Sequence, residues 1–253
     1  MFTNPENYPT DLNGAPFTSF ALSHANNSVL NSLLCNGAST ATKDTNGRTL
    51  LAQAINLLDT ACFTGNQAES KLANRLKSIH ILRDYGADPL EDGSGVPCCF
   101  LGFRWWHEET IKGWLLNAVS SDHRNLRGET LIMIAAQRAS RPELLALLRT
   151  LGGIDLKDNE GRTALTHAAA SEYATVEEPW ALELLVAYGA NIEHQDNHGL
   201  TPLMTAAMKG NLRNVRWLLE RGASKDSRDS KNNTARDLAI KHTTLIELIN
   251  LLR

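Results

Sequence analysis

The sequence predicts an all-α fold: a solenoid in which helix-turn-helix units stack on one another and are joined by short β-hairpin-like loops. Two observations predict it. Three short phrases recur in a fixed order along the 253 residues, and most copies of the first phrase are 33 residues apart. A period of this length is typical of one supersecondary unit that buries its apolar face only by stacking on its neighbours.

The first phrase is an acidic residue or asparagine, two variable residues and a glycine. Its fourth positions are Gly14, Gly47, Gly95, Gly128, Gly161, Gly199 and Asn232. The intervals between these positions are 33, 48, 33, 33, 38 and 33 residues. Aspartate at the first position bonds the nearby backbone, and glycine at the fourth takes a positive φ without steric cost. Each copy therefore predicts a tight turn, and the two longer intervals predict insertions.

A second phrase begins with threonine, which caps a helix, and continues with small and apolar residues. Its copies are "TLLAQAI" at 49–55, "TLIMIAA" at 130–136, "TALTHAA" at 163–169, "TPLMTAA" at 201–207 and "TARDLAI" at 234–240. A third phrase closes an apolar run at helical spacing with Gly-Ala, where glycine ends a helix. Its copies are "LLCNGAS" at 33–39, "LRDYGAD" at 82–88, "LVAYGAN" at 185–191 and "LLERGAS" at 218–224. These phrases predict two antiparallel helices in each unit.

Together the three phrases resemble the ankyrin repeat, and residues 196–228 match that family's pattern nearly throughout. The resemblance runs from about Asp11 to Arg253 and implies a single ankyrin-repeat domain of about seven units, with degenerate units at the two ends. The domain spans 1–253, and its units are expected at 11–43, 44–91, 92–124, 125–157, 158–195, 196–228 and 229–253. The second unit carries an insertion near 60–74, the fifth a short insertion near 172–178, and the last is a C-terminal cap.

The resemblance implies a protein–protein interaction module that acts as an adaptor, scaffold or inhibitor. It binds a partner protein on a concave face formed by hairpin tips and first helices. The expected partner-binding residues are Arg104, Trp105, Trp106, Arg127, Gln137, Arg138, Glu160, Arg162, His198, Leu200, Met208 and Lys209. Arginine and lysine outnumber glutamate in this set, which favours an acidic or extended partner segment; merely solvated charges are the open alternative. No catalytic, cofactor-binding or metal-binding residue is expected, and we expect a monomer.

The stretch "FRWWHEE" at 103–109 concentrates two tryptophans in the third unit. The register of the repeats places Arg104 and Trp105 at the exposed end of the first helix, with Trp106 and His107 in the turn beyond it. Tryptophan and arginine are enriched at the centres of protein interfaces, where they bury much area at low entropic cost. Two roles stay open for each tryptophan: it contacts a partner, or it covers the core beneath the neighbouring insertion.

A metal site or a cysteine-dependent enzyme centred on Cys98, Cys99 and His107 is the alternative function. Adjacent cysteines hold one ion awkwardly, and the spacing matches no common zinc motif. A catalytic cysteine needs a pocket that orients it against a base. Small residues at this place fit the packing of a first helix, so we expect a non-enzymatic protein.

Composition argues against several other classes. The net charge is −3, and aromatic residues are scarce outside the tryptophan cluster, so we expect no nucleic-acid partner. We find no signal peptide and no apolar run of about 18 residues, so we expect no membrane insertion. The four cysteines show no disulfide framework, which favours a reducing, cytoplasmic compartment. A cytosolic adaptor and an effector secreted by an intracellular bacterium into a host cell both fit this description.

Overall fold

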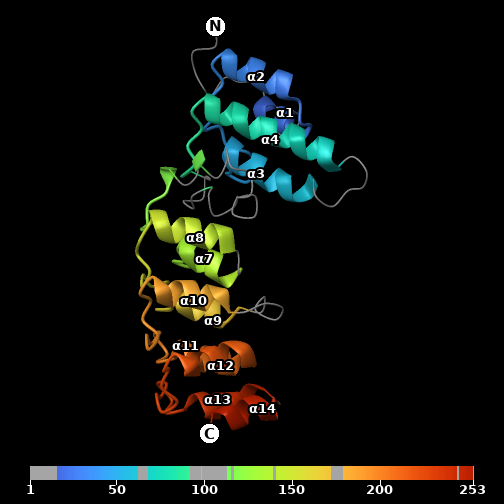
Figure 1. The fold of residues 1–253 in the computed structure, drawn as a ribbon. Helices are drawn as coiled ribbons and strands as arrows, with labels where there is room; N and C mark the ends of the chain where they lie inside the picture. Colours follow the sequence, from blue (N-terminus) through green and yellow to red (C-terminus); the bar gives the residue numbers. More distant parts are fainter. Residues whose placement is uncertain are drawn as a thin grey trace. The chain divides into compact units, whose positions relative to one another are not determined.

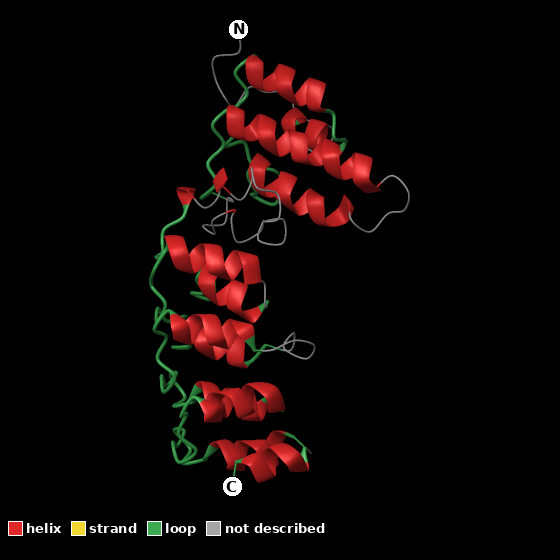
Figure 2. Ribbon diagram, in the orientation of Figure 1, coloured by secondary structure: helices red, strands yellow, loops and turns green. Residues whose placement is uncertain are grey.

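The computed structural model describes residues 16–61, 68–91, 98, 113–114, 117–138, 141–171, 179–243 and 245–252. These residues form helices joined by turns, without a regular strand (Figure 2). Internal packing divides the chain into two compact parts, 1–119 and 120–253, and each is described by itself (Figure 1). The helical architecture of the described residues confirms the predicted fold class.

Among its described residues, the first part contains two helix pairs. They are α1 (Phe17–Ser23), α2 (Asn27–Cys35), α3 (Leu50–Ala61) and α4 (Ala68–Asp84). α1 packs on α3 and α2 on α4, while α3 and α4 pack against each other (Figure 1). Leu30, Leu58 and Leu82 are almost fully buried in this part. Residues 68–74 of the expected insertion lie within α4.

In the second part, the described residues form four helix pairs that stack in chain order. They are α7 (Leu131–Gln137), α8 (Arg141–Thr150), α9 (Ala164–Ala169), α10 (Trp180–Ala187), α11 (Pro202–Met208), α12 (Leu212–Glu220), α13 (Ala235–His242) and α14 (Ile246–Leu251). The first helices of successive pairs pack on one another, α7 on α9, α9 on α11 and α11 on α13 (Figure 1). Second helices follow the same order, with α8 on α10 and α12 on α14. Each unit thus buries its apolar face against the next.

Threonine precedes each first helix of the second part, as predicted. The Oγ1 atoms of Thr130, Thr201 and Thr234 accept a backbone N–H from the third helical residue at 3.4, 3.2 and 3.3 Å. These bonds satisfy a donor that a helix start would otherwise leave unpaired. The alanine pairs of α7, α9 and α11 are at most 2% exposed. Thr163 precedes α9 without such a capping bond, so the predicted cap is confirmed at three of these four helices. The small alanine side chains let neighbouring first helices approach closely, as predicted.

The predicted turn occurs five times among the described residues. The copies lie at 44–47, 125–128, 158–161, 196–199 and 229–232. In each, the side-chain oxygen of the first residue accepts the backbone N–H groups of the third and fifth residues. The fourth residue has a φ between 64° and 77°, the left-handed region that glycine occupies freely. Asn232 adopts it in the last copy, so the degenerate phrase still forms the turn.

Consecutive turns of the second part are bonded to one another. The N–H of a turn's second residue donates to the carbonyl oxygen of the preceding turn's third residue. Asn159 donates to Arg127 at 3.1 Å, Asn197 donates to Glu160 at 2.9 Å, and the last turn repeats this bond. The turns therefore form a continuous ladder along one edge of the second part, and this ladder aligns the first helices that follow each turn.

Candidate functional site

Turns and first helices of the second part line a continuous hollow, which we call the inner groove. One section has a volume of about 660 Å³, and a second section, toward the C-terminus, has a volume of about 390 Å³. The two sections share His198, Leu200 and Met208. All lining residues belong to the turns or the residue directly after each turn, to α7, α9, α11 and α13, or to the first two residues after these helices. Hairpin tips and first helices are also the elements in which the resemblance to ankyrin repeats implies partner binding.

Eight of the twelve expected partner-binding residues line the inner groove. They are Gln137, Arg138, Glu160, Arg162, His198, Leu200, Met208 and Lys209. Arg127 is exposed in its turn but does not line the groove. Arg104, Trp105 and Trp106 lie outside the described residues. The repeat register alone thus gathers side chains from three successive units on one surface.

The floor of the groove contains residues that are not among the expected partner-binding residues. These residues are Thr166, His167, Ala170, Ser171, Asp196 and Thr205. His167 and Thr205 occupy the same place in their units, nine residues after the first residue of the turn. This spacing identifies the two residues in the sequence, because nine residues later the chain comes back to the first residue of the turn.

Cations dominate the rim of the inner groove. Arg138 and Lys209 lie directly after α7 and α11, where the negative end of the helix dipole favours positive charge. Lysines also line the C-terminal section. Glu160 is an acidic rim residue, and its carboxylate pairs with the Arg162 guanidinium at 3.1 Å. The rim therefore presents more positive than negative charge to a bound segment.

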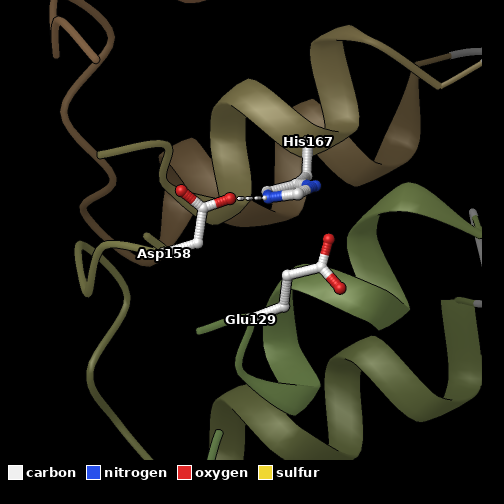
Figure 3. A group of neighbouring side chains, drawn as sticks. All are labelled: Glu129, Asp158 and His167. Carbon is white, nitrogen blue, oxygen red and sulfur yellow. Dashed lines mark hydrogen bonds and ion pairs between the residues drawn. The ribbon is translucent and has the colours of Figure 1, made fainter. Parts of the chain in front are cut away.

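Asp158 is the centre of a buried polar network beside the groove (Figure 3). Its Oδ1 accepts the N–H groups of Glu160 and Arg162, each at 2.9 Å. Its Oδ2 accepts Nε–H of Arg162 at 2.8 Å and Nε2–H of His167 at 2.9 Å. An ionised carboxylate only accepts, so the proton of this bond is assigned to Nε2. Glu129 reaches the same network from the preceding unit.

Glu129, Asp158 and His167 have the residue types of a metal site, and their donor atoms all lie within 4.8 Å of one another. The hydrogen bonds argue against that use. A carboxylate has about four acceptor positions, and Asp158 already receives four protein donors. The Arg162 guanidinium also repels a cation. We therefore interpret the network as the link that fixes its turn to helix α9.

The protonation states of this network follow from burial and from its partners. Burial lowers the pKa of His167, and the positive charge of Arg162 acts in the same direction. The bond to Asp158 and the negative charges of Asp158 and Glu129 oppose this shift without cancelling it. Burial raises the pKa of Asp158, but hydrogen bonds from Arg162 and His167 outweigh burial and lower that pKa overall. At neutral pH, His167 is therefore neutral and Asp158 is ionised.

We expect the protein to lose stability as the pH falls below the ordinary pKa of histidine, about 6.5. Between that value and the lower folded-state pKa of His167, the unfolded chain binds a proton that the folded chain does not. The midpoint of thermal unfolding should therefore drop between about pH 7.5 and about pH 5.5. His167→Gln, which copies Gln53 at the equivalent place, should remove much of this drop. An equal drop in variant and wild type would contradict the assignment.

The alternative site around the cysteines is described only in part. Cys98 is buried, and its thiol donates to the Glu91 carbonyl oxygen at 3.2 Å. Its burial fits the packing role expected of a small residue in a first helix. Cys99 and His107 lie outside the described residues.

Among the described helices, none is long and apolar enough to cross a bilayer.

Known proteins share this repeat pattern. The family profile for ankyrin repeats in many copies matches residues 185–239. "B-cell lymphoma 3 protein homolog" of Mus musculus is 30% identical over 162 residues, which is 62% of this chain and 35% of that protein. "SH3 and multiple ankyrin repeat domains protein 1" of Homo sapiens is 37% identical over 90 residues, which is 35% of this chain and 4% of that protein. The chain thus spans about a third or less of these relatives.

A crystal structure of similar fold is that of the ankyrin repeat domain of Bcl-3, described as a unique member of the IkappaB protein family. The TM-score is 0.63 at 21% sequence identity, and the match covers 93% of this chain and 97% of that chain. At this identity the likeness concerns the fold. The recurring phrases, the equal turns of the described residues and the matched family profile agree with one another: the chain contains ankyrin repeats, which the profile matches over residues 185–239.

Proposed function

We propose that the protein binds another protein through the inner groove and acts as an adaptor, scaffold or inhibitor. Ankyrin repeats indicate a protein–protein interaction module. The assignment to the groove rests on one observation: eight expected partner-binding residues lie on this one surface. The groove combines apolar side chains such as Leu200 and Met208 with a charged rim, as the contact surfaces of protein complexes do.

The partner that we propose is an extended, acidic segment of a protein. Arg138 and Lys209 line the larger section of the groove, and Lys231 and Lys241 line the C-terminal section. Opposite charge on a partner steers its approach and fixes its register on such a surface. Glu160 opposes an acidic segment only weakly, because its carboxylate is already paired with an arginine.

Affinity capture from cells with two matched variants tests this proposal. Arg138→Gln with Lys209→Gln removes two positive charges from the rim. Arg213→Gln with Arg216→Gln removes two charges from the exposed face of α12, outside the groove. We expect the rim variant to recover a specific partner at least about tenfold less well than wild type, and the α12 variant to recover it fully. Equal recovery of every partner by both variants, each with wild-type circular dichroism, would refute the groove as the binding surface.

A further inference from the structure

One turn of the second part lacks a side-chain bond that the other described turns have. In those four turns, the side chain four positions after the turn's first residue is bonded to the side chain of that first residue. Arg48 pairs with Asp44 at 3.1 Å, and Arg162 pairs with Asp158 at 2.8 Å. In the turn that begins at Asp196, the equivalent residue is Leu200, whose side chain has no polar atom.

Asp196 also lacks the bond that Asp158 alone among the described turns receives from the residue nine positions later. In the unit that begins at Asp158 this place holds His167, whose imidazole donates to Asp158 at 2.9 Å. In the next unit the place holds Thr205, whose shorter side chain does not bond Asp196. The Thr205 hydroxyl is buried and has no hydrogen-bond partner within the described part of the chain. An unpaired hydroxyl of the groove lining therefore stands at the place that the His167 imidazole occupies one unit earlier.

Asp196 has thus lost both of the side-chain partners that Asp158 has. Its Oδ1 accepts the N–H groups of His198 and Leu200 at 2.8 and 2.9 Å. Among the described residues, no side chain donates to its Oδ2. Asp196 is only 9% exposed, and it lines the inner groove together with Thr205. A carboxylate buried to this degree is stabilised by a paired cation or by hydrogen-bond donors.

We propose that an arginine side chain of the bound partner supplies the missing donors. The Asp196 site, as we call it, consists of Asp196, Leu200, Thr205 and Met208, which all line the inner groove. This inference rests on the function proposed above, and it names one residue type that the partner presents. A guanidinium donates through several N–H groups in a fixed fork, so one arginine can bond Asp196 Oδ2 and Thr205 Oγ1 together.

The walls of the Asp196 site fit the stem of an arginine as well as its charge. Leu200 and Met208 are shared by both sections of the groove, and their apolar side chains can pack against the methylene groups of the stem. Arg138 and Lys209 at the rim repel a strongly basic segment. The partner segment is therefore mainly acidic and carries a single arginine at the position that faces Asp196.

Methyl NMR of the full chain with a small probe tests the site. The probe is N-acetyl-arginine N′-methylamide, and the neutral N-acetyl-citrulline N′-methylamide is its matched control. We expect the arginine probe to shift the methyl resonances of Leu200, Thr205 and Met208 to saturation, with an affinity at least about tenfold above that of the citrulline probe. Equal shifts from the two probes, or no saturable shift, would overturn the inference.

Asp196→Asn removes the charge and keeps the turn. Asn125 shows that asparagine forms this turn, because its Oδ1 accepts the N–H groups of Arg127 and Glu129 at 2.9 and 3.0 Å. The variant should bind the arginine probe at least about tenfold more weakly than wild type. An unchanged affinity in a folded variant would show that the carboxylate does not hold the guanidinium.

Two further variants fill the Asp196 site from within the chain. Leu200→Arg copies Arg162, and Thr205→His copies His167 of the preceding unit. Each should raise the midpoint of thermal unfolding, and the double variant should abolish saturable binding of the arginine probe, because Asp158 shows that an arginine and a histidine together fill the same Oδ2. Binding of the probe by the double variant at wild-type affinity would contradict the inference.

Partner capture separates this inference from the proposed function. Asp196→Asn should weaken recovery of the partner by about tenfold, as the rim variant Arg138→Gln with Lys209→Gln also should. If the rim variant loses the partner and Asp196→Asn keeps it in full, the groove binds a protein without an arginine anchor, and this inference alone fails. If both variants keep every partner, the proposed function fails as well.

Discussion

Asp158→Ala is expected to lower the free energy of unfolding by at least about 3 kcal/mol. The carboxylate accepts two backbone N–H groups of its turn, one N–H of Arg162 and one of His167. Alanine leaves all four donors without this acceptor, and His167 is only 4% exposed, so water replaces the carboxylate poorly. Removal of one partner from a buried network is among the costliest single substitutions. Urea unfolding followed by circular dichroism measures the loss.

Asp158→Asn is the matched control for this prediction. Asparagine keeps an acceptor oxygen for the two backbone N–H groups, as Asn125 does in its own turn. Its NH2 group cannot accept the N–H groups of Arg162 and His167 as Oδ2 does, and the negative charge is lost. Because the turn bonds remain, we expect a smaller loss of about 1–2 kcal/mol. If alanine costs no more than asparagine, the turn bonds of Asp158 do not contribute as described.

Gly161→Ala is expected to destabilise the protein by roughly 2–4 kcal/mol. Gly161 has a φ of 77°, which strains any residue with a β-carbon. A β-carbon at this position would also lie 2.9 Å from the backbone nitrogen of Asn197. That nitrogen donates to the Glu160 carbonyl oxygen at 2.9 Å, in the bond that joins two successive turns. The substitution therefore adds a clash to the backbone strain, and urea unfolding measures the sum.

Gly222→Ala separates these two effects. Gly222 has a φ of 88°, and a β-carbon there would meet no atom within 4 Å. We expect this variant to show the backbone strain alone, about 1–2 kcal/mol. The difference between the two alanine variants measures the cost of separating stacked turns. Equal losses would mean that close approach of the turns adds nothing to stability.

The turns and helix starts were predictable from the sequence because each depends on residues close together in the chain. The first residue of a turn bonds backbone groups two and four positions later, and the threonine caps reach only three positions. This local chemistry explains why the register extends through a degenerate phrase to Asn232, which has a φ of 64°. Given this register, the 33-residue period is sufficient to place Arg138, Leu200 and Lys209 on one surface.

The floor of the groove was not predictable in the same way. His167 looks in the sequence like an ordinary residue of a first helix, and its burial and its bond to Asp158 come from tertiary structure. The Asp196 site lacks two side-chain donors that Asp158 has in its own unit. Leu200 stands at the place of Arg162, and Thr205 stands at the place of His167. Such a gap is visible only when the hydrogen bonds of one unit are compared with those of the next. For Trp105 and Trp106, the expected contact with a partner stays a prediction.

Hydrogen exchange on the captured complex tests most directly whether the inner groove binds the partner. The amide exchange of the protein is compared between its free and bound states. We predict slower exchange on binding in the turns at 158–162 and 196–200 and at the C-terminal ends of α7, α9 and α11. The second helices α8, α10 and α12 should exchange at the same rate in both states. Slower exchange confined to those second helices, with the turns unchanged, would contradict the assignment of the groove.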